Sequence, residues 1–408
     1  MSAAAARRTE VVVVGGGPAG AATATRLGRA GVAVTLLEAA PEPRWRACGV
    51  FTSPASVTAL RRLGVDDAAL ATVARPVPAM RVESGAGIEF RLTYGGTGSL
   101  ADSAVGMARP GLDELLLAGA AAAGAEVRRG ARVVELDRDR AGTWTVQLTD
   151  GTAIRPDVLV GADGRRSTVA RRMGVIARPS MPARIGLTFH IADGALATGG
   201  EGRIVLIRDG YVGLAPVPGG RLNVGIVLGR SWFPRLRSES PARLAAGIVR
   251  SLSNAHGAGT VDIEILDHVA GASPLAHAVS RRAGPGWLLV GDAGGFLDPF
   301  TGEGLHRSLA SAELAAGAIL AARNDAARSG RPTAIERYDA AMRATFRNRD
   351  LVTRIVDGFL SRPALFEYAA RRLSAREHAR DTMGRVIGDL VPAGRALDPR
   401  FLASVLRP

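Results

Sequence analysis

The sequence predicts an α/β protein with a Rossmann-like domain, an inserted antiparallel β-sheet domain and C-terminal helices. Three observations support this prediction. The β-branched run Val11–Val14 precedes a glycine cluster and a helical pattern, as expected of a buried parallel strand that opens a βαβ unit. Strand-like segments gather in residues 178–270. From residue 334 on, the pattern is helical and arginine-rich, with Pro363 and Pro392 as breakers.

Composition indicates a soluble globular chain. Its 408 residues give room for two or three packed regions, and 47% of them are apolar and 22% charged. No apolar run approaches the roughly 18–20 residues that span a bilayer, and residues 1–8 lack the apolar core of a secretory signal. Cys48 is the single cysteine, which excludes an intramolecular disulfide and favours a reducing, cytoplasmic location.

The basic residues exclude several functions. The net charge is +14, yet the chain has no lysine, and its arginines are spread rather than clustered. We therefore expect no nucleic-acid partner, although peripheral contact with anionic lipid stays possible. Schiff-base, pyridoxal phosphate and Walker A chemistry all need lysine. The histidines show no metal-ligand spacing, so we expect no metal, and the nearest pair, His268 and His277, is expected to be structural or superficial.

A glycine motif follows the first strand. Gly15, Gly17 and Gly20 hold the G-x-G-x-x-G positions, and Pro18 and Ala19 lie at the start of the helix. The first glycine allows a tight turn, the second lets the backbone approach a pyrophosphate, and the third lets helix and strand pack closely. The helix N-terminus supplies free N–H groups to the phosphates.

A carboxylate completes this motif. Val32–Leu37 is the expected second strand, and Glu38 ends it, eighteen residues after Gly20. A carboxylate at this place can accept hydrogen bonds from both ribose hydroxyls and disfavours a 2′-phosphate. The sequence therefore predicts a bound dinucleotide.

Two later segments also end an apolar strand with glycine and aspartate. Trp287–Val290 leads to Gly291 and Asp292, and Asp157–Val160 leads to the stretch Gly161–Gly164, which contains Asp163. Ligands bind at the carboxyl ends of strands in open α/β sheets. The alternatives are an N-cap or strand-end turn for Asp292 and a surface turn for Asp163.

Together, the three motifs resemble the FAD-dependent aromatic hydroxylase superfamily (p-hydroxybenzoate hydroxylase-like), which includes the geranylgeranyl reductases. The resemblance covers residues 10–175 and 285–320 and implies bound FAD and a fold of the glutathione-reductase/p-hydroxybenzoate-hydroxylase type. Residues 293–304 are similar to the geranylgeranyl-reductase branch. Related halogenases use a lysine, which this chain lacks.

The resemblance implies roles for individual residues. Cys48 and Gly49 match a Cys-Gly near the flavin ring, where Cys48 would donate a proton to substrate, with its acidity raised by Arg44 or Arg46; a buried, inert cysteine is the alternative. Arg109 matches an arginine near the flavin pyrophosphate, with a solvated arginine as the alternative. The implied cofactor-binding residues are Gly15, Gly17, Pro18, Ala19, Gly20, Glu38, Cys48, Gly49, Arg109, Val133, Asp163, Gly164, Asp292, Gly302, Gly304 and Leu305. The implied substrate residues are Tyr211, Pro216 and Phe300, although the tryptophan and phenylalanine of the reductases' aromatic motif are missing around Tyr211.

The resemblance also implies an activity. We expect an FAD-dependent oxidoreductase that reduces C=C bonds of a small apolar, isoprenoid-like or secondary-metabolite substrate by hydride from reduced flavin. An aromatic monooxygenase is the main alternative, followed by oxidation of a secondary metabolite without oxygen insertion. Only one dinucleotide fingerprint is found, so NAD(P)H would bind transiently, or another donor would supply the electrons.

The expected domain boundaries follow from the placement of the motifs. The FAD-binding domain is discontinuous, and the sheet domain is inserted into it. The expected strands of the sheet domain include Arg203–Ile207, Tyr211–Leu214, Leu222–Leu228 and Val261–Leu266. The predicted ranges are 1–75, 105–175 and 271–330 for the FAD-binding domain, 76–104 and 176–270 for the sheet domain, and 331–408 for the helical C-terminal segment.

Overall fold

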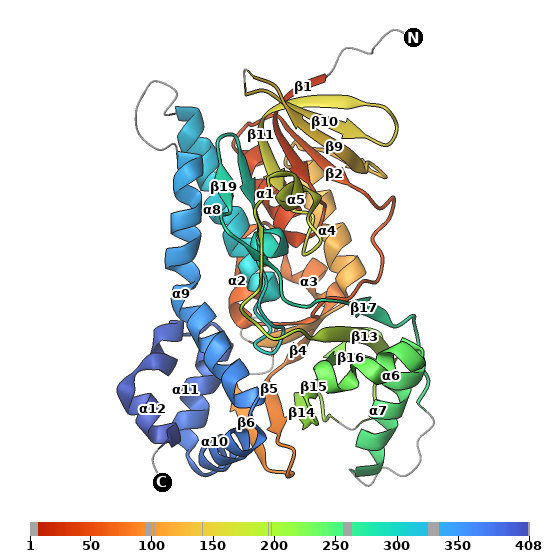
Figure 1. Ribbon diagram of the computed structural model, residues 1–408, viewed down its shortest axis with the longest axis vertical. Helices are drawn as coiled ribbons and strands as arrows, with labels where there is room; N and C mark the ends of the chain where they lie inside the picture. Colours follow the sequence, from red (N-terminus) through yellow and green to blue (C-terminus); the bar gives the residue numbers. More distant parts are fainter. Residues whose placement is uncertain are drawn as a thin grey trace.

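The computed structural model describes residues 7–94, 99–100, 103–140, 142–194, 196, 198–255, 263–324 and 334–406. Within these residues an eight-stranded, largely parallel sheet lies above a seven-stranded sheet, and helices cover both (Figure 1). The predicted fold class is confirmed: a parallel sheet of the Rossmann type carries an inserted, mainly antiparallel sheet and ends in helices.

The eight-stranded sheet aligns several strand ends along one edge. Its parallel part runs in the order β20-β11-β1-β2-β8. Val14 lies opposite Gly161 and Leu37, and Gly161 lies opposite Leu289. The strands of this sheet are β1 (Arg7–Val14), β2 (Val34–Glu38), β8 (Glu126–Arg129), β9 (Val133–Arg138), β10 (Trp144–Leu148), β11 (Ala153–Gly161), β19 (Ala283–Gly284) and β20 (Trp287–Leu289).

The helices around this sheet begin and pack as their sequences predict. Pro18 is the first residue of α1, where its missing N–H costs no hydrogen bond. Small buried residues of α1 allow it to pack closely against α4 and α8. The helices of this part are α1 (Pro18–Arg29), α2 (Pro54–Arg62), α3 (Asp67–Val73), α4 (Arg109–Ala122), α5 (Thr168–Arg172), α8 (Gly304–Asn324) and α9 (Ala334–Leu360).

The seven-stranded sheet has an outer and an inner face. Side chains alternate between the faces along each strand. On the outer face, Phe189, Leu214 and Val224 pack in one core with Leu244 of α7 (Pro241–Ala255). The inner face turns toward the eight-stranded sheet and the C-terminal helices (Figure 1). The strands, in sheet order, are β17 (Ala270–Ala272), β13 (Ile185–Ala192), β16 (Arg221–Leu228), β15 (Gly210–Val217), β14 (Gly202–Ile207), β5 (Ala79–Glu83) and β6 (Glu89–Thr93).

One strand predicted for this region does not form. Residues 263–266 of the predicted Val261–Leu266 strand have no regular structure, and residues 261–262 lie outside the described residues. The segment instead runs along the sheet edge, where the Leu266 N–H donates to the His190 carbonyl. Two helices in the same stretch, α6 (Phe233–Ser238) and α7, are not anticipated by the sequence analysis.

The C-terminal helices cover β5 and β6. Phe366 and Leu373 of α10 (Pro363–Ala375) share a core with Phe90 and Leu92 of β6. This core also includes residues of α11 (Glu377–Ile387) and α12 (Pro399–Leu406). A small sheet joins the two larger layers and consists of β3 (Phe51–Thr52), β7 (Ala104–Met107) and β4 (Ala74–Val77).

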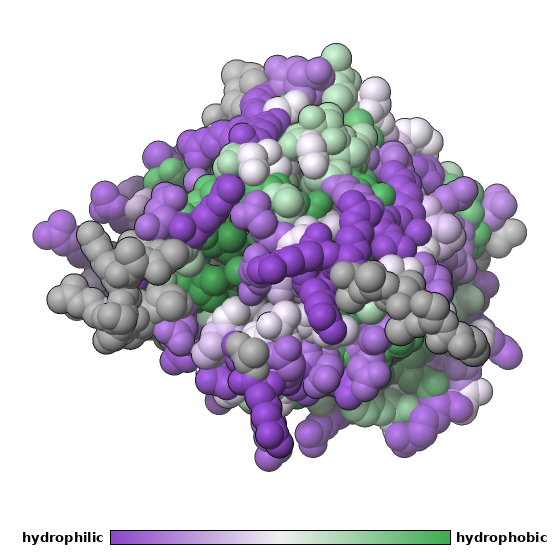
Figure 2. All heavy atoms as spheres, turned by 90° about the horizontal axis from the view of Figure 1, so that it is seen from above, coloured by the Kyte–Doolittle hydropathy of each residue, from purple (hydrophilic) through white to green (hydrophobic). Residues whose placement is uncertain are grey.

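The surface is mainly polar where Figure 2 shows it. Hydrophilic side chains dominate that face, and apolar side chains show in smaller areas between them. No helix of the described part is long and apolar enough to cross a membrane.

The contact between α9 and β20 gives a test of the packing. The Tyr338 hydroxyl donates to the Leu289 carbonyl at 2.9 Å and is fully buried. We expect Tyr338→Phe to lower the free energy of unfolding by about 1 kcal/mol, because one buried hydrogen bond is lost. Urea unfolding measures the change. Tyr368→Phe is the control, since its hydroxyl donates to the Leu406 carbonyl at an exposed site. Equal effects of the two changes would contradict this packing.

Candidate functional site

The glycine motif lies at the end of β1, against the end of β11. Gly15 has φ +107°, and a Cβ there would lie 2.4 Å from the Ala162 carbonyl oxygen. A Cβ on Gly20 would lie 1.9 Å from the Gly15 oxygen. At Gly17 a Cβ would meet no atom within 4 Å. Packing therefore requires glycine at positions 15 and 20, whereas the open side of Gly17 fits the approach of a phosphate.

The Gly-Asp segment near residue 292 touches the same helix. Gly291 has φ +57°, and a Cβ there would lie 2.7 Å from the Cβ of Ala19 in α1. Asp292 follows directly, with its Oδ2 3.9 Å from Arg165 Nε. Burial raises the pKa of Asp292, although Arg165 and Arg109 oppose this change. The structure thus brings two motifs together that are about 270 residues apart in the chain.

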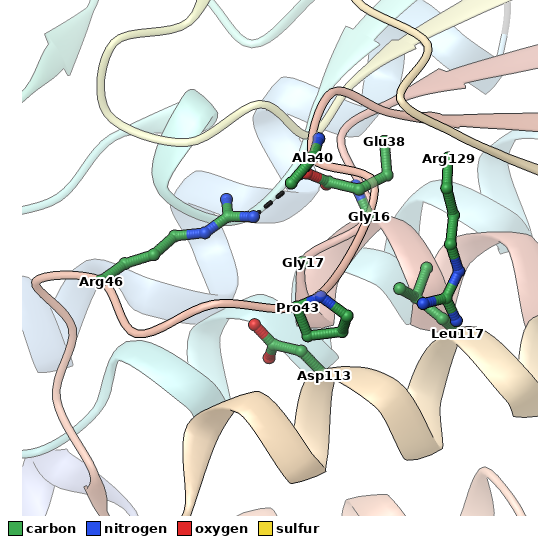
Figure 3. Close-up of a pocket in the computed structure, with 9 residues that line it drawn as sticks. All are labelled: Gly16, Gly17, Glu38, Ala40, Pro43, Arg46, Asp113, Leu117 and Arg129. Atoms are coloured by element: carbon green, nitrogen blue, oxygen red, sulfur yellow. Dashed lines mark hydrogen bonds and ion pairs between the residues drawn. The ribbon is translucent and has the colours of Figure 1, made fainter.

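Glu38 lies in a pocket beside the glycine motif (Figure 3). Its Oε2 accepts from the Gly16 N–H at 2.8 Å, and its Oε1 accepts from the Ala40 N–H at 2.9 Å and from Arg46 at 3.0 Å. Burial opposes the charge, but these hydrogen bonds and Arg46 outweigh it and lower the pKa of Glu38. The carboxylate is therefore ionised at neutral pH. The pocket is lined by Gly16, Gly17, Glu38, Ala40, Pro43, Arg46, Asp113, Leu117 and Arg129.

Asp163 follows the end of β11. Its Oδ2 accepts from the backbone N–H of Thr168 at 2.6 Å and of Val169 at 3.3 Å, at the start of α5. Its Oδ1 is buried and has no hydrogen-bond partner. Burial raises the pKa of Asp163, and the hydrogen bonds oppose this change. The surface-turn alternative does not fit this side chain, although the Asp163 carboxylate does support the start of α5. Gly164 follows with φ +74° and has open space on its side-chain side.

Arg109 and Cys48 share one half-buried cluster. Arg109 is the first residue of α4, donates to Asp113 at 3.1 Å and reaches the Gly49 carbonyl at 3.5 Å. Burial acts against its charge, but Asp113 outweighs this effect and raises the pKa of Arg109. Its Nε is buried without a partner. The solvated-arginine alternative is therefore wrong, and a charged donor lies beside Cys48.

The expected acidity of Cys48 needs correction. Burial raises the pKa of the Cys48 thiol, and this effect outweighs the opposing charges of Arg109 and Arg46. Arg46 is also engaged by Glu38. Cys48 is therefore a protonated thiol at neutral pH, rather than a thiol acidified by Arg44 or Arg46.

The loop before α8 is held by Asp298. Its carboxylate accepts from the Tyr211 hydroxyl at 2.7 Å, from Arg184 at 3.0 Å and from the Phe300 N–H at 3.0 Å. Arg184 also pairs with Asp357 of α9. Burial, reinforced by Asp298, raises the pKa of Tyr211. This network joins the loop to the inner face of the seven-stranded sheet and to α9.

Three predicted residues lie at the end of this loop and the start of α8. Gly302 has φ +66°, and a Cβ there would lie 2.6 Å from the Phe51 ring. Gly304 is the first residue of α8, and Leu305 follows it in the helix. This helix start lies near the Gly291–Asp292 turn, because a Cβ on Gly291 would also lie 3.3 Å from the Ser308 hydroxyl.

The inner face has an open patch at its centre. Gly213 and Gly225 lie directly opposite each other on β15 and β16. A Cβ on either glycine would meet only a backbone oxygen, at 3.9 Å. Tyr211 lies two residues before Gly213 on the same face, and its ring contacts Phe300 edge-on at 5.1 Å. We call Gly213 and Gly225 the glycine floor, beside which both aromatic rings lie.

The structure separates Pro216 from these residues. Pro216 lies opposite Leu222, which belongs to the outer core with α7. Tyr211 and Pro216 are five residues apart, and an odd separation along a strand places side chains on opposite faces. The prediction that both line one site is therefore not supported by the register.

Other residues near the site were missed or only loosely placed by sequence reasoning. Val133 begins β9, just after the Ala131 N–H donates to the Glu38 carbonyl. His277 is buried, and its Nε2 lies 3.3 Å from the Ala293 carbonyl, so it is structural as expected. Arg165 and the glycine floor were not predicted. A glycine inside a strand marks a close approach to another group, and this signal identifies Gly213 and Gly225.

The fold and these strand ends define a dinucleotide-binding flavoprotein of the α/β class. The chain belongs to the FAD binding domain family, whose model matches residues 8–348. The open side of Gly17, the unpartnered Arg109 Nε and the Asp163 carboxylate fit an FAD pyrophosphate and ribityl chain. The protein is an FAD-dependent oxidoreductase.

Known proteins are similar over half of the chain or more. A menaquinone reductase of Mycolicibacterium smegmatis is 30% identical over 310 residues, which cover 73% of each chain. A digeranylgeranylglycerophospholipid reductase of Methanosarcina mazei is 28% identical over 50% of each chain. The crystal structure of a flavoprotein/dehydrogenase from Cytophaga hutchinsonii shares the fold, with a TM-score of 0.79 and 20% identity over 98% of this chain and 95% of that one.

A methyl group at Gly20 tests the close approach in the motif. We expect Gly20→Ala to weaken FAD binding at least about tenfold, because the new Cβ displaces the turn at Gly15. Titration of FAD-depleted protein, followed by flavin fluorescence, measures the affinity. Gly247→Ala in α7 is the control, since a Cβ there meets no atom within 4 Å. Unchanged affinity of the Gly20 variant would argue against this site.

Alkylation tests the protonation state of Cys48. We expect iodoacetamide to modify it with a pH midpoint above that of a peptide of residues 44–50. The peptide holds the same arginines without the burial that raises the pKa of the protein thiol. Mass spectrometry follows the single modification. A midpoint below that of the peptide would show that the arginines dominate.

Proposed function

We propose that this oxidoreductase reduces a carbon–carbon double bond of an apolar substrate with an isoprenoid chain. The glycine floor carries this proposal. It leaves open space on the inner face beside the Asp298–Gly304 loop, where the flavin ring would lie. Ile204, Leu206, Ala215 and Val227 border the floor on the same face. Such a surface favours an alkene over a charged substrate.

The relatives support the same substrate class. The menaquinone reductase and the digeranylgeranylglycerophospholipid reductase are both named for isoprenoid lipids. Both proteins are named as reductases of lipids with isoprenoid chains, but the head groups of the two lipids differ. We therefore assign the isoprenoid chain, and no particular lipid, to this protein.

Residues of this chain would hold the cofactor and move a proton. Gly17, Glu38 and Arg109 would bind the pyrophosphate and ribose of FAD. Bound FAD, once reduced, supplies a hydride to one alkene carbon. The Cys48 thiol would give a proton to the other carbon and recover it from solvent. Its raised pKa keeps the thiol protonated at neutral pH, so the proton is available, although a higher pKa also makes the thiol a weaker acid.

Turnover without oxygen tests the proposal. The FAD-loaded enzyme is reduced with NADPH or dithionite and given a menaquinone with a short isoprenoid chain in detergent micelles. We expect a product that is two hydrogens heavier in its isoprenoid chain, under strictly anaerobic conditions. Stoichiometric oxygen consumption with insertion of an oxygen atom would instead identify a monooxygenase. An unaltered isoprenoid chain would also contradict the proposal.

Two variants locate the reaction. Gly213→Val fills the space above the glycine floor, and valine is well tolerated in a strand. The substrate would lose this space, so kcat/KM should fall at least about tenfold while FAD binding is unchanged. Gly271→Val on the edge strand β17 is the matched control, since its Cβ meets only the Leu187 side chain at 3.8 Å. Cys48→Ser should lower kcat and keep the flavin. Full activity of Gly213→Val would place the substrate elsewhere.

A further inference from the structure

A histidine–aspartate pair lies on the inner face of the seven-stranded sheet. The ring nitrogen His190 Nδ1 lies 2.5 Å from Asp267 Oδ2, and the backbone N–H of His190 donates to Asp267 Oδ1 at 3.0 Å. Its neighbours Phe189 and Ile191 pack in the outer core, so the imidazole points to the inner face. Two contacts to one carboxylate fix the orientation of the ring.

The outer nitrogen of this imidazole has no partner. His190 is 3% exposed, and its Nε2 is buried without a hydrogen bond. The ring of Trp45 packs against it, with centroids 4.3 Å apart. The Trp45 Nε1 is also buried and unpartnered. A buried polar atom without a partner is unfavourable, so two such atoms in contacting rings need an explanation.

The hydrogen-bonding character of both atoms follows from their surroundings. Asp267, as a carboxylate, accepts the Nδ1 proton. Burial lowers the pKa of His190, against the effect of Asp267 and together with the charge of Arg221. The imidazole is therefore neutral at pH 7, and its Nε2 is an acceptor. The Trp45 indole is a donor only.

The pair lies next to the glycine floor. His190 is opposite Asn223 on β16, and Asn223 is opposite Ala215 on β15. The neighbouring row of the inner face contains Gly225 and Gly213. Trp45 lies three residues before Cys48. A molecule lying over the floor would therefore be bordered by Trp45 and His190 on one side and by Tyr211 and Phe300 on the other.

We infer that Trp45 and His190 bind a hydroxyl group of the substrate. The hydroxyl donates a hydrogen bond to His190 Nε2 and accepts one from the Trp45 Nε1–H. A carbonyl or ether oxygen only accepts, and an ammonium only donates, so neither satisfies both atoms. The inference rests on the proposed function, because it takes the molecule above the glycine floor to be the substrate. It assigns this substrate an alcohol or phenol group in addition to its isoprenoid chain.

A bound water would satisfy the same two atoms, so the test must distinguish a substrate hydroxyl from a water molecule. 1-Naphthol and 1-methoxynaphthalene are flat apolar rings that differ in one hydroxyl proton. Their affinities for the FAD-loaded enzyme are measured by the perturbation of the flavin absorbance. We expect 1-naphthol to bind about tenfold more tightly, which corresponds to one hydrogen bond.

Two variants test the two hydrogen bonds separately. In His190→Asn, the amide keeps a donor for Asp267 and removes Nε2, and in Trp45→Phe the ring remains without its N–H. His190→Asn should bind the two naphthalenes equally, because the acceptor for the hydroxyl proton is gone. Trp45→Phe should bind both naphthalenes more weakly and keep the preference, because the oxygen of either ligand accepts from the lost N–H. His268→Asn, an exposed neighbour of Asp267, and Trp232→Phe, whose indole donates to the Arg208 carbonyl at 2.6 Å, are the matched controls and should leave both affinities unchanged.

Several outcomes would overturn the inference. Equal affinities in the unaltered enzyme would mean that water satisfies the pair, and binding of neither naphthalene would exclude a ring hydroxyl here. A preference that persists in His190→Asn would place the hydroxyl elsewhere. The result is separable from the reductase proposal: a naphthol preference without alkene reduction would support the hydroxyl site and reject the reaction.

Discussion

The alignment of parallel strand ends is the constraint on which the rest of the structure depends. Val14 of β1 lies in register with Gly161 of β11, and Gly161 with Leu289 of β20. This register places the three loops that follow the strands at one edge of the sheet. The loops approach so closely that a Cβ cannot be accommodated at Gly15 or Gly20. A cofactor-binding site therefore forms from segments that are far apart in the sequence.

The second sheet contributes through the alternation of its side chains. One face is closed by α7, whereas the other faces the Asp298–Gly304 loop and the C-terminal helices. Asp298 connects these parts, because its carboxylate accepts from Tyr211 of β15 and from Arg184, which also pairs with Asp357 of α9. Each partner comes from a different element, so the position of the loop depends on the packing of all of them. Buried charge networks of this kind are sensitive to the loss of one partner.

The parts of the site that are local in sequence could be predicted. The strand, glycine turn and helix at residues 11–29 form a continuous segment whose residue types dictate its shape. The fold class, the FAD family and the long helix at Gly304 follow from similar patterns. The opposite orientations of Tyr211 and Pro216 were also available from the sequence, because an odd separation on a strand changes the face.

Features that depend on tertiary packing could not be predicted. The sequence places two arginines next to Cys48 and suggests an acidic thiol, but burial reverses the effect on its pKa. His190 and Asp267 are 77 residues apart, and the segment around Asp267 was expected to follow a strand that does not form. Trp45, in the segment between β2 and β3, contacts the His190 ring. No local pattern encodes a contact between three such segments.

A crystal structure of the protein with FAD tests the central claim most directly, because it shows whether one cofactor spans the aligned strand ends. We predict that the ribose of the adenosine lies against Glu38, the pyrophosphate beside Gly17 and Arg109, and the flavin ring near Cys48, facing the open space above the glycine floor. Density for the flavin ring away from the inner face of the seven-stranded sheet, or for the pyrophosphate away from the start of α1, would contradict the account.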